Sequence, residues 1–385
     1  MGPFDSIRPY HDHEVAEVLQ RLAADPAFLD VLIRYRYPAL ASSLGWLLRP
    51  LFAWRLRKEI RGIDTVAGLQ RLVAPYVERS VVKATDGISY SGIEQLVPDQ
   101  PYLYLANHRD IVMDPAYVNY ALYQAGIDTP RLAIGDNLLQ KPFVSDLMRL
   151  NKSFIVRRSP GTRKEKLEAF LQLSGYINHS LLEEHCSIWI AQAEGRAKDG
   201  NDRTDSAILK MFHVSRRELE FADAVASLNL TPVAISYEYD PCDLDKAREL
   251  HVRATTGSYE KQPGEDDASI ARGITGYKGR VHVHFGTPIT NGFADAKQLA
   301  ACIDQVIWQG YRLYPVNYLA WHQWQERDRS LPVPPVEQVF GADEIGKARA
   351  VWEERLQQCP PEHRPYLVMQ YANPLQNQFR SQESA

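Results

Sequence analysis

The chain has 385 residues, of which 45% are hydrophobic, and its formal net charge is −4 at pH 7. This composition is sufficient for a large buried core and excludes a disordered chain, and the absence of a basic excess argues against general nucleic-acid binding. The four cysteines are scattered without a Cys-x-x-Cys pair, which favours neither a disulfide framework nor a zinc knuckle and indicates a reducing compartment.

Apolar residues recur at helical spacing from about residue 11 to residue 80, which predicts an N-terminal helical region. Pro38 and Pro50 are expected to break or kink these helices, because proline lacks a backbone N–H and clashes with the preceding turn. The clearest apolar face is rich in leucine and consists of Leu40, Leu44, Leu47, Leu48, Leu51 and Phe52.

The segment that carries this leucine face is also strongly basic. Seven arginines and lysines and one acid, Glu59, lie between Arg34 and Arg61, together with Trp46 and Trp54. Such an amphipathic segment suits an anionic membrane surface, where each basic residue contributes on the order of 1 kcal/mol. An ordinary helical layer with solvated arginines fits the pattern equally well, so both interpretations stay open. Charges interrupt every apolar stretch before the roughly 18 residues of a spanning helix, so the chain is not expected to cross a bilayer.

Short apolar runs alternate with helical patterns from about residue 85 to residue 290. The runs that predict strands are Tyr102–Ala106, Arg131–Ile134, Ser153–Val156, Ser187–Ala191, Pro232–Tyr237 and Arg280–Phe285. The helical patterns are Tyr117–Tyr123, Asn137–Leu150, Arg163–Glu183 and Arg216–Ser227. This alternation predicts an α/β domain with a central mixed sheet flanked by helices.

The remaining segments complete the expected organisation. Glu238–Tyr277 is rich in charged residues and is expected to be an excursion on the surface. The chain becomes helical again after residue 296, and Ser330–Pro335 separates two helical pieces. We therefore expect a helical region at residues 1–84, an α/β domain at residues 85–290 and a helical extension at residues 291–385.

A histidine and two carboxylates directly follow the apolar run Tyr102–Ala106. The stretch reads Asn107-His108-Arg109-Asp110-Ile111-Val112-Met113-Asp114-Pro115. An imidazole that is oriented by a carboxylate can take a proton from a hydroxyl near neutral pH, so an enzyme is the leading hypothesis. The alternative is a helix start that Asn107 or Asp110 caps, and capping is compatible with catalysis.

Two other interpretations of this stretch are weaker. His108-Arg109-Asp110 matches the start of a protein-kinase catalytic loop, but that loop requires Asn where Pro115 stands. A metal site requires three or four ligands, and this stretch supplies only a fragment of such a set. Neither a metal nor another cofactor is therefore expected.

Five segments occur in an order that resembles the glycerolipid acyltransferases, the family that esterifies glycerol phosphates and lysophospholipids. They are Asn107-His108 with Asp114-Pro115, Lys152–Arg158, Glu194-Gly195-Arg196, Thr231–Ile235 and Arg280–Pro288, and together they span roughly residues 85–290. The family separates its His and Asp by four residues, whereas five separate His108 from Asp114. Either a one-residue bulge is accommodated or Asp110 shares the role of Asp114. The third segment is one residue shorter than the family's Glu-Gly-x-Arg.

The resemblance implies a site and a reaction. His108 would act as a general base that Asp114 orients. The implied substrate-binding residues are Arg158, which would hold a phosphate, and Glu194, Gly195 and Arg196. The implied reaction moves a fatty acyl group from acyl-CoA or acyl carrier protein to a hydroxyl of glycerol 3-phosphate or lysophosphatidate. We expect a cytoplasmic protein that binds the anionic lipid of the membrane face peripherally.

Two alternative functions use the same fold. A thioester or ester hydrolase would direct the same base at water instead of an acceptor hydroxyl. A membrane-binding scaffold would keep the fold while the altered spacing of His108 and Asp114 abolishes catalysis.

Overall fold

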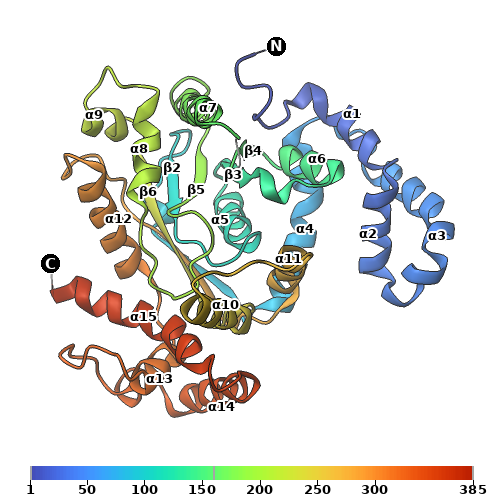
Figure 1. Ribbon diagram of the computed structural model, residues 1–385. Helices are drawn as coiled ribbons and strands as arrows, with labels where there is room; N and C mark the ends of the chain where they lie inside the picture. The colour runs from blue at the N-terminus through green and yellow to red at the C-terminus, as the bar shows by residue number, and fades with distance from the viewer. Residues whose placement is uncertain (1, 159–160, 384–385) are drawn as a thin grey trace. The chain divides into compact units, whose positions relative to one another are not determined.

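The computed structural model describes residues 2–158 and 161–383 of the chain (Figure 1). It contains two compact units, each assembled from two separate stretches of sequence. The first unit comprises Met1–Val77 and Pro130–Tyr176, and the second comprises Glu78–Thr129 and Ile177–Ala385. This grouping by contacts differs from the three consecutive regions expected from the sequence, because the N-terminal helices pack with a later segment of the chain.

The first unit combines the N-terminal helices with a parallel pair of strands. Its elements are α1 (Asp12–Leu22), α2 (Pro26–Arg36), α3 (Pro38–Glu59), the start of α4 (Val66–Ala84), β3 (Arg131–Gly135), the short turn η2 (Asp136–Leu138), α6 (Pro142–Leu150), β4 (Ser153–Val156) and most of α7 (Arg163–Leu182). Apolar side chains of α1 and α6 share one buried cluster. Asp146 of α6 accepts hydrogen bonds from Tyr10 and Arg21, which fixes α1 against α6.

The two prolines of the basic segment behave differently. Pro38 is the first residue of α3, where a missing N–H costs nothing because the first turn of a helix has no acceptor for it. Pro50 was expected to break or kink its helix. Helix α3 is not broken there, because it continues through Pro50 to Glu59. No helix in residues 2–158 or 161–383 is long and apolar enough to span a bilayer.

The second unit is built on a mixed sheet, as the sequence predicts. The strands lie in the order β1 (Ile88–Ser91), β7 (Val281–Phe285), β6 (Leu230–Tyr237), β2 (Leu103–Ala106) and β5 (Ile188–Ala191). β6 and β7 are antiparallel, and the other neighbouring pairs are parallel. All four residues of β2 are completely buried, which places the residues after its end in the interior of the unit. The six predicted strands are confirmed, and β1 was missed because two of its four residues are serines, so it lacks the apolar run that marks the other strands.

Helices surround this sheet and continue to the C-terminus. They are α5 (Met113–Gln124), α8 (Ser206–Val214), α9 (Phe221–Ala226), α10 (Asp243–Thr256), α11 (Glu265–Thr275), α12 (Ala296–Gly310), α13 (Pro315–Gln323), α14 (Ala342–Gln358) and α15 (Arg364–Glu383), with the short turns η1 (Ile93–Gln95) and η3 (Val336–Gln338). The separation that the sequence predicts at Ser330–Pro335 falls between α13 and α14. Figure 1 shows α13, α14 and α15 as a group at the end of the chain, and buried apolar residues of all three share a cluster with Ala247 of α10.

Two predictions for this unit were wrong in detail. Glu238–Tyr277 is not a surface excursion, because it contains α10 and α11, and Asp243 and Lys246 are buried. These charged side chains are buried because each is paired: Lys246 with Asp240, and Asp243 with Arg355. The helix expected at Arg216–Ser227 is limited to α9, and the preceding α8 was missed.

Candidate active site

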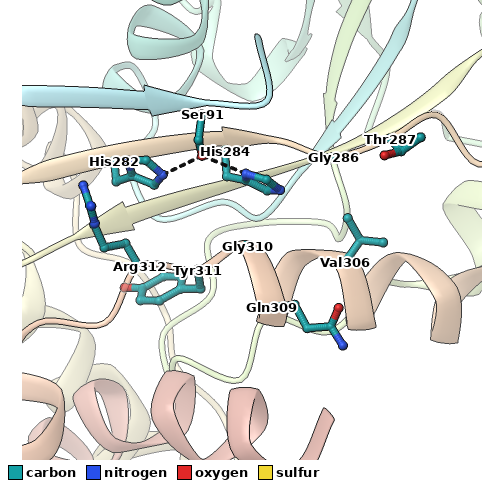
Figure 2. Close-up of a pocket in the computed structure, with 10 residues that line it drawn as sticks. All are labelled: Ser91, His282, His284, Gly286, Thr287, Val306, Gln309, Gly310, Tyr311 and Arg312. Atoms are coloured by element: carbon teal, nitrogen blue, oxygen red, sulfur yellow. Dashed lines mark hydrogen bonds between the residues drawn. The ribbon is translucent and has the colours of Figure 1, made fainter. Parts of the chain in front are cut away.

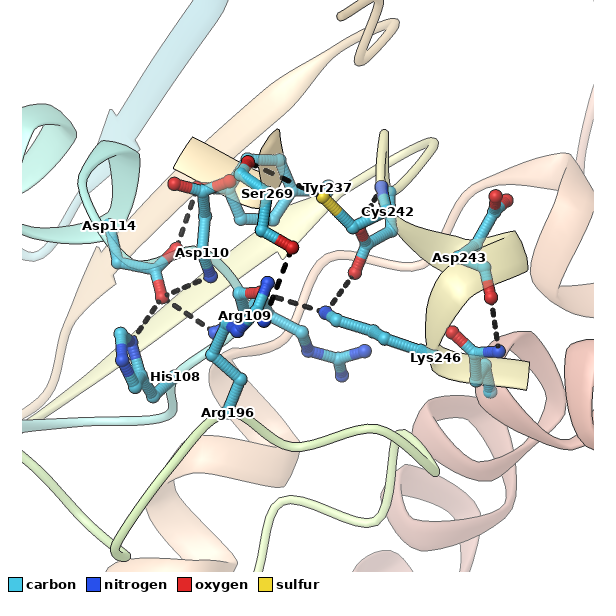
Figure 3. Close-up of polar contacts among 12 residues, drawn as sticks. His108, Arg109, Asp110, Asp114, Arg196, Tyr237, Cys242, Asp243, Lys246 and Ser269 are labelled. Carbon is cyan, nitrogen blue, oxygen red and sulfur yellow. Dashed lines mark hydrogen bonds and ion pairs between the residues drawn. The ribbon is translucent and has the colours of Figure 1, made fainter. Parts of the chain in front are cut away.

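The loop between β2 and α5 places His108 against Asp114. The Nδ1 atom of His108 lies 2.8 Å from Oδ2 of Asp114, and the Asp114 side chain is completely buried at the start of α5 (Figure 3). His108 retains some exposure and packs edge-on against Trp189 of β5, with ring centroids 5.9 Å apart. The structure therefore brings together the histidine and the carboxylate that the sequence singles out.

Asp114 is surrounded by donors on both of its oxygens. Besides His108, the backbone N–H groups of Arg109 and Asp110 donate to Oδ2 at 2.6 and 2.9 Å. The hydroxyl of Tyr237, at the end of β6, donates to Oδ1 at 2.6 Å. Burial and the neighbouring Asp114 raise the pKa of Tyr237 well above its ordinary value, so the phenol stays a donor. A carboxylate with four donors is acceptor-only, which assigns the hydrogen of His108 to Nδ1 and leaves a lone pair on Nε2.

The extra residue between His108 and Asp114 is accommodated in a turn at Ile111 and Val112. Oδ1 of Asp110 accepts the backbone N–H groups of Val112 and Met113 at 3.0 and 2.8 Å, at the start of α5. Burial, together with Asp114, raises the pKa of Asp110. Gly273 of α11 packs so closely on the Asp110 carboxylate that a Cβ atom there would lie 2.1 Å from Oδ2. Asp110 is thus bound to the helix start, and Asp114 is the carboxylate that contacts His108.

Asn107 and Arg109 attach the His108 loop to the sheet and to its neighbours. The amide of Asn107 bonds both the N–H and the C=O of Ile235 in β6, at 2.7 and 3.1 Å. The guanidinium of Arg109 is buried, pairs with Asp202 and lies over the ring of Tyr311. Burial alone would lower the pKa of Arg109, but the Asp202 carboxylate raises it, so the arginine stays charged. These contacts hold the backbone on both sides of His108.

A second layer of buried charges connects this loop to the C-terminal helices. Nζ of Lys246 donates to the carbonyl oxygen of Arg109 at 2.7 Å and pairs with Asp240 (Figure 3). The hydroxyl of Tyr371 in α15 donates to the Asp243 carboxylate at 2.6 Å and accepts the backbone N–H of Asp240 at 3.0 Å. Sequence reasoning missed this network, because its members are distant in sequence and no local pattern distinguishes them from surface charges.

The predicted segment Glu194-Gly195-Arg196 follows β5 in the same unit. Glu194 is exposed, and Gly195 has a φ of +78°, a left-handed conformation that favours glycine. One N–H of the Arg196 guanidinium lies 3.4 Å from the Ser269 hydroxyl of α11. The N–H of the next residue, Ala197, donates to the carbonyl oxygen of His108 at 2.7 Å, so this turn is attached to the histidine.

Arg158 lies in the first unit, two residues beyond the end of β4. Its side chain is exposed, and its backbone N–H donates to Asp136 at 3.2 Å. The side chain runs beside Gly135 at the end of β3, where a Cβ atom would lie 2.5 Å from Nε of Arg158. A glycine at position 135 therefore leaves the space through which the guanidinium stem passes.

Comparisons with known proteins agree with the resemblance seen in the sequence. Residues 87–228 match the family model described as acyltransferase. The dihydroxyacetone phosphate acyltransferases of Bos taurus and Homo sapiens are each 25% identical to the chain over 211 residues. This match covers 53% of the chain and 29% of each relative, so the chain spans less than a third of the length of these relatives.

Among solved structures, the 1-acyl-sn-glycerophosphate acyltransferase of Thermotoga maritima is similar at 14% identity and a TM-score of 0.35, covering 74% of this chain and 95% of that one. Groups of three or more side chains suited to a metal ion are absent from the described residues. The matched residues include His108, Asp114, Arg158 and Glu194. The α/β part of the chain thus matches the acyltransferase family model at these positions and is similar to the dihydroxyacetone phosphate acyltransferases over about half of the chain.

Proposed function

We propose that this protein transfers a fatty acyl group from acyl-CoA or acyl carrier protein to a hydroxyl of glycerol 3-phosphate or lysophosphatidate, a step of phospholipid synthesis. One observation carries the proposal: Asp114 fixes Nδ1 of His108, and Nε2 has no hydrogen-bond partner among the described residues. A partly exposed ring nitrogen with a free lone pair is suited to accept a proton from a bound hydroxyl.

The reaction follows the logic of a catalytic triad without a nucleophilic serine. Nε2 of His108 takes the proton of the acceptor hydroxyl while the oxygen attacks the thioester carbonyl and forms the C–O bond. The buried Asp114 carboxylate stabilises the imidazolium that results. The C–S bond then breaks, and the departing thiolate takes the proton from Nε2, which yields the ester and the free thiol. No covalent acyl-enzyme is required.

The acceptor phosphate is assigned to Arg158, and Glu194, Gly195 and Arg196 are assigned to the substrate, on the strength of the family resemblance. A guanidinium meets a phosphate through two parallel N–H bonds, whereas an ammonium acts as a point charge. The variant Arg158→Lys should therefore raise the KM for the acceptor and leave the KM for the acyl donor close to its initial value. Equal losses for both substrates would contradict the assignment.

The α2–α3 surface supports the proposed attachment to a membrane. This surface consists of the exposed apolar residues of α2 and α3, which are Val31, Tyr35, Leu40, Leu44, Trp46, Leu47, Leu51 and Trp54. Trp46 and Trp54 are 67% and 61% exposed, although burying each would remove a large apolar area from water. Most of the basic side chains of the segment are exposed beside them, including Arg34, Arg36, Arg55, Arg57 and Lys58. The alternative of an internal helical layer would bury the leucine face, of which only Leu48 and Phe52 are half-buried.

We therefore propose a peripheral protein that binds anionic lipid at the cytoplasmic face of the membrane. Sedimentation with vesicles that contain anionic lipid should decrease as the salt concentration rises, because exposed charges are screened. Replacing Leu47 and Leu51 by serine should reduce the sedimented fraction further. The matched control makes the same change to serine at two exposed residues outside this surface, Val97 and Val339. It should sediment as the parent does. If neither salt nor the leucine changes affect sedimentation, the surface has another role.

A thiol-release assay separates the proposed transferase from the two alternatives. The chain is incubated with acyl-CoA alone, with glycerol 3-phosphate and with lysophosphatidate. Release that depends on either acceptor supports the transferase and identifies the acceptor. Release without an acceptor indicates the hydrolase, and no release with any acceptor indicates the scaffold.

A further inference from the structure

In the His108 loop, two successive peptide N–H groups donate to Asp114. The N–H of Arg109 and the N–H of Asp110 both reach Oδ2 of the carboxylate, at 2.6 and 2.9 Å. The carbonyl oxygen of each peptide group belongs to the preceding residue, which is His108 for the first peptide and Arg109 for the second. The orientation of the carboxylate that contacts His108 therefore depends on what holds these two carbonyl oxygens.

A donor from another part of the second unit binds each of these oxygens. The carbonyl oxygen of His108 accepts the backbone N–H of Ala197 at 2.7 Å, from the turn that follows β5. The carbonyl oxygen of Arg109 accepts Nζ of Lys246 at 2.7 Å, from the first turn of α10 (Figure 3). The second peptide thus has an ammonium on its oxygen and the Asp114 carboxylate on its N–H. Because hydrogen bonds in a chain polarise one another, Lys246 strengthens the N–H bond to Asp114.

Lys246 is buried and paired, which fixes its ammonium in one place. The residue is 3% exposed, and its Nζ contacts the Asp240 carboxylate as well as the carbonyl oxygen of Arg109. Burial alone would raise the pKa of Asp240, but Lys246 and the N–H of Cys242, which donates to Oδ1 at 2.8 Å, keep it below its ordinary value. The acid is therefore charged and neutralises the buried ammonium, and Nζ is also a donor to the His108 loop.

The C-terminal helix α15 fixes the start of α10, on which Lys246 lies. The hydroxyl of Tyr371 donates to the carboxylate of Asp243, the first residue of α10, at 2.6 Å. The side-chain amide of Gln370 donates to the carbonyl oxygen of Asp243 at 3.0 Å. Lys246 lies outside residues 87–228, which match the acyltransferase family model, so that match assigns it no role.

We propose that Lys246 is a positioning residue for the acyl transfer: it holds the peptide between Arg109 and Asp110, and through that peptide the Asp114 carboxylate. This inference rests on the proposed function, because it concerns the same base, His108. Lys246 acts on the reaction through a peptide group and not through the substrates. Its loss should therefore lower kcat and leave the KM values for donor and acceptor within about twofold of those of the parent.

Two variants separate this role from a contribution to stability alone. Asp240→Asn removes the acid but keeps Nζ of Lys246 as a donor to Arg109. Its Tm should decrease because a buried ammonium loses its acid, whereas its kcat should stay close to the parental value. The double variant Asp240→Asn/Lys246→Met removes the donor as well and leaves neither charge unpaired. Its Tm should be no lower than that of Asp240→Asn, but its kcat should fall by about 10–10²-fold, the scale of a displaced catalytic group.

A row of hydrogen bonds on the opposite face of β6 and β7 offers a matched control. Side chains alternate between the two faces of a strand, so Ser236 points away from the face of Tyr237. The β6–β7 register pairs Ser236 with His282, and His284 lies on the same face of β7, so both histidines are on the Ser236 face. They line a pocket of about 490 Å³ beside the end of α12 (Figure 2).

Arg312 starts this row. Its guanidinium, which can only donate, gives a hydrogen bond to Oγ of Ser89 at 2.9 Å, and the Ser89 hydroxyl lies 2.8 Å from Nδ1 of His282. Oγ of Ser91 lies between the two rings, 2.9 Å from Nε2 of His282 and 2.8 Å from Nδ1 of His284 (Figure 2). Arg312→Met thus removes a cation that orients histidines other than the proposed base, and its kcat should equal that of the parent.

Amide signals in nuclear magnetic resonance spectra give a second measurement, which does not depend on turnover. The ¹H signal of the Asp110 amide should lie at lower field in the parent and in Asp240→Asn than in the double variant, because the donor on the peptide oxygen strengthens the N–H bond. The Arg109 amide, whose peptide oxygen is bonded by Ala197, should move less.

The outcomes distinguish this inference from the proposed function. A kcat that follows the Tm across the parent and the two Asp240 variants, or an equal loss of kcat in Arg312→Met, would overturn the role of Lys246. An Asp110 amide signal that is the same in the parent and the double variant would overturn it as well. If the parent itself releases no thiol with any acceptor, the proposed function is wrong, and the amide signals still test the bond from Lys246 to the His108 loop.

Discussion

Histidines lie in two different settings beside the two faces of β6. On one face, His108 bonds a buried carboxylate through Nδ1, and Tyr237 of β6 bonds the other oxygen of that carboxylate. On the other face, His282 and His284 bond serine hydroxyls, and the chain of bonds begins at Arg312. Both settings fix the tautomer and the orientation of an imidazole, so orientation alone does not distinguish them.

The difference lies in the charge of the partner. A carboxylate stabilises an imidazolium, so His108 can hold a proton during a reaction and return it to a leaving group. A serine hydroxyl and a neighbouring arginine give no such stabilisation, so His282 and His284 are suited to stay neutral and to donate a hydrogen bond. The same residue type is therefore suited to the proposed role of a base on one face and to that of a fixed donor on the other.

The largest expected effect is the loss of the base. His108→Ala should reduce acceptor-dependent thiol release by about 10²–10⁴-fold, the usual contribution of a positioned general base. The control His322→Ala removes an exposed histidine of α13 and should retain the parental rate. If His108→Ala keeps the parental rate while its circular dichroism is unchanged, His108 is not the base and the comparison of the two faces fails.

The second prediction separates the two carboxylates of the loop. Asp114→Asn should approach the loss of His108→Ala, because it removes the charge that stabilises the imidazolium. Asp110→Asn should be tolerated, since Asn accepts the N–H groups of Val112 and Met113 about as well as Asp does. Steady-state rates of the two folded variants provide the measurement, and the reverse ranking would assign the role to Asp110.

The third prediction concerns the phenol that bonds Asp114 from β6. Tyr237→Phe removes one of four donors to the carboxylate and leaves the other three in place. We expect a rate loss of about tenfold or less and a lower Tm, because a buried acceptor loses a partner. A loss as large as that of Asp114→Asn would show that Tyr237 takes part in the proton transfer itself.

The sequence predicts the central part of this site, but it does not predict the residues that hold the His108 loop in place. The histidine and Asp114 follow a buried strand within a short motif, so their proximity could be expected, and the predicted strands locate them correctly. The sequence indicated Tyr237 only weakly. The alternation of side chains along β6 places Tyr237 on the same face as Ile235, but it does not predict that Tyr237 bonds Asp114. Asp202 and Lys246 come from distant segments, and their burial depends on pairings that form only in the folded chain.

The smallest expected effect is the acid sensitivity that His282 contributes. Its pKa in the folded chain, about 4, is below the ordinary value of 6.5, so the unfolded chain binds the proton first as the pH falls. The stabilising contribution is complete above pH 6.5 and is lost progressively between pH 6.5 and pH 4. The Tm of His282→Gln should therefore decrease less than that of the parent between pH 7 and pH 4.5, when thermal unfolding is followed by circular dichroism. His322→Gln, which changes an exposed ring, should show the parental decrease. Equal decreases in all three proteins would mean that His282 is protonated in the folded state near its ordinary pKa, and the contrast between the two faces of β6 would then rest on His108 alone.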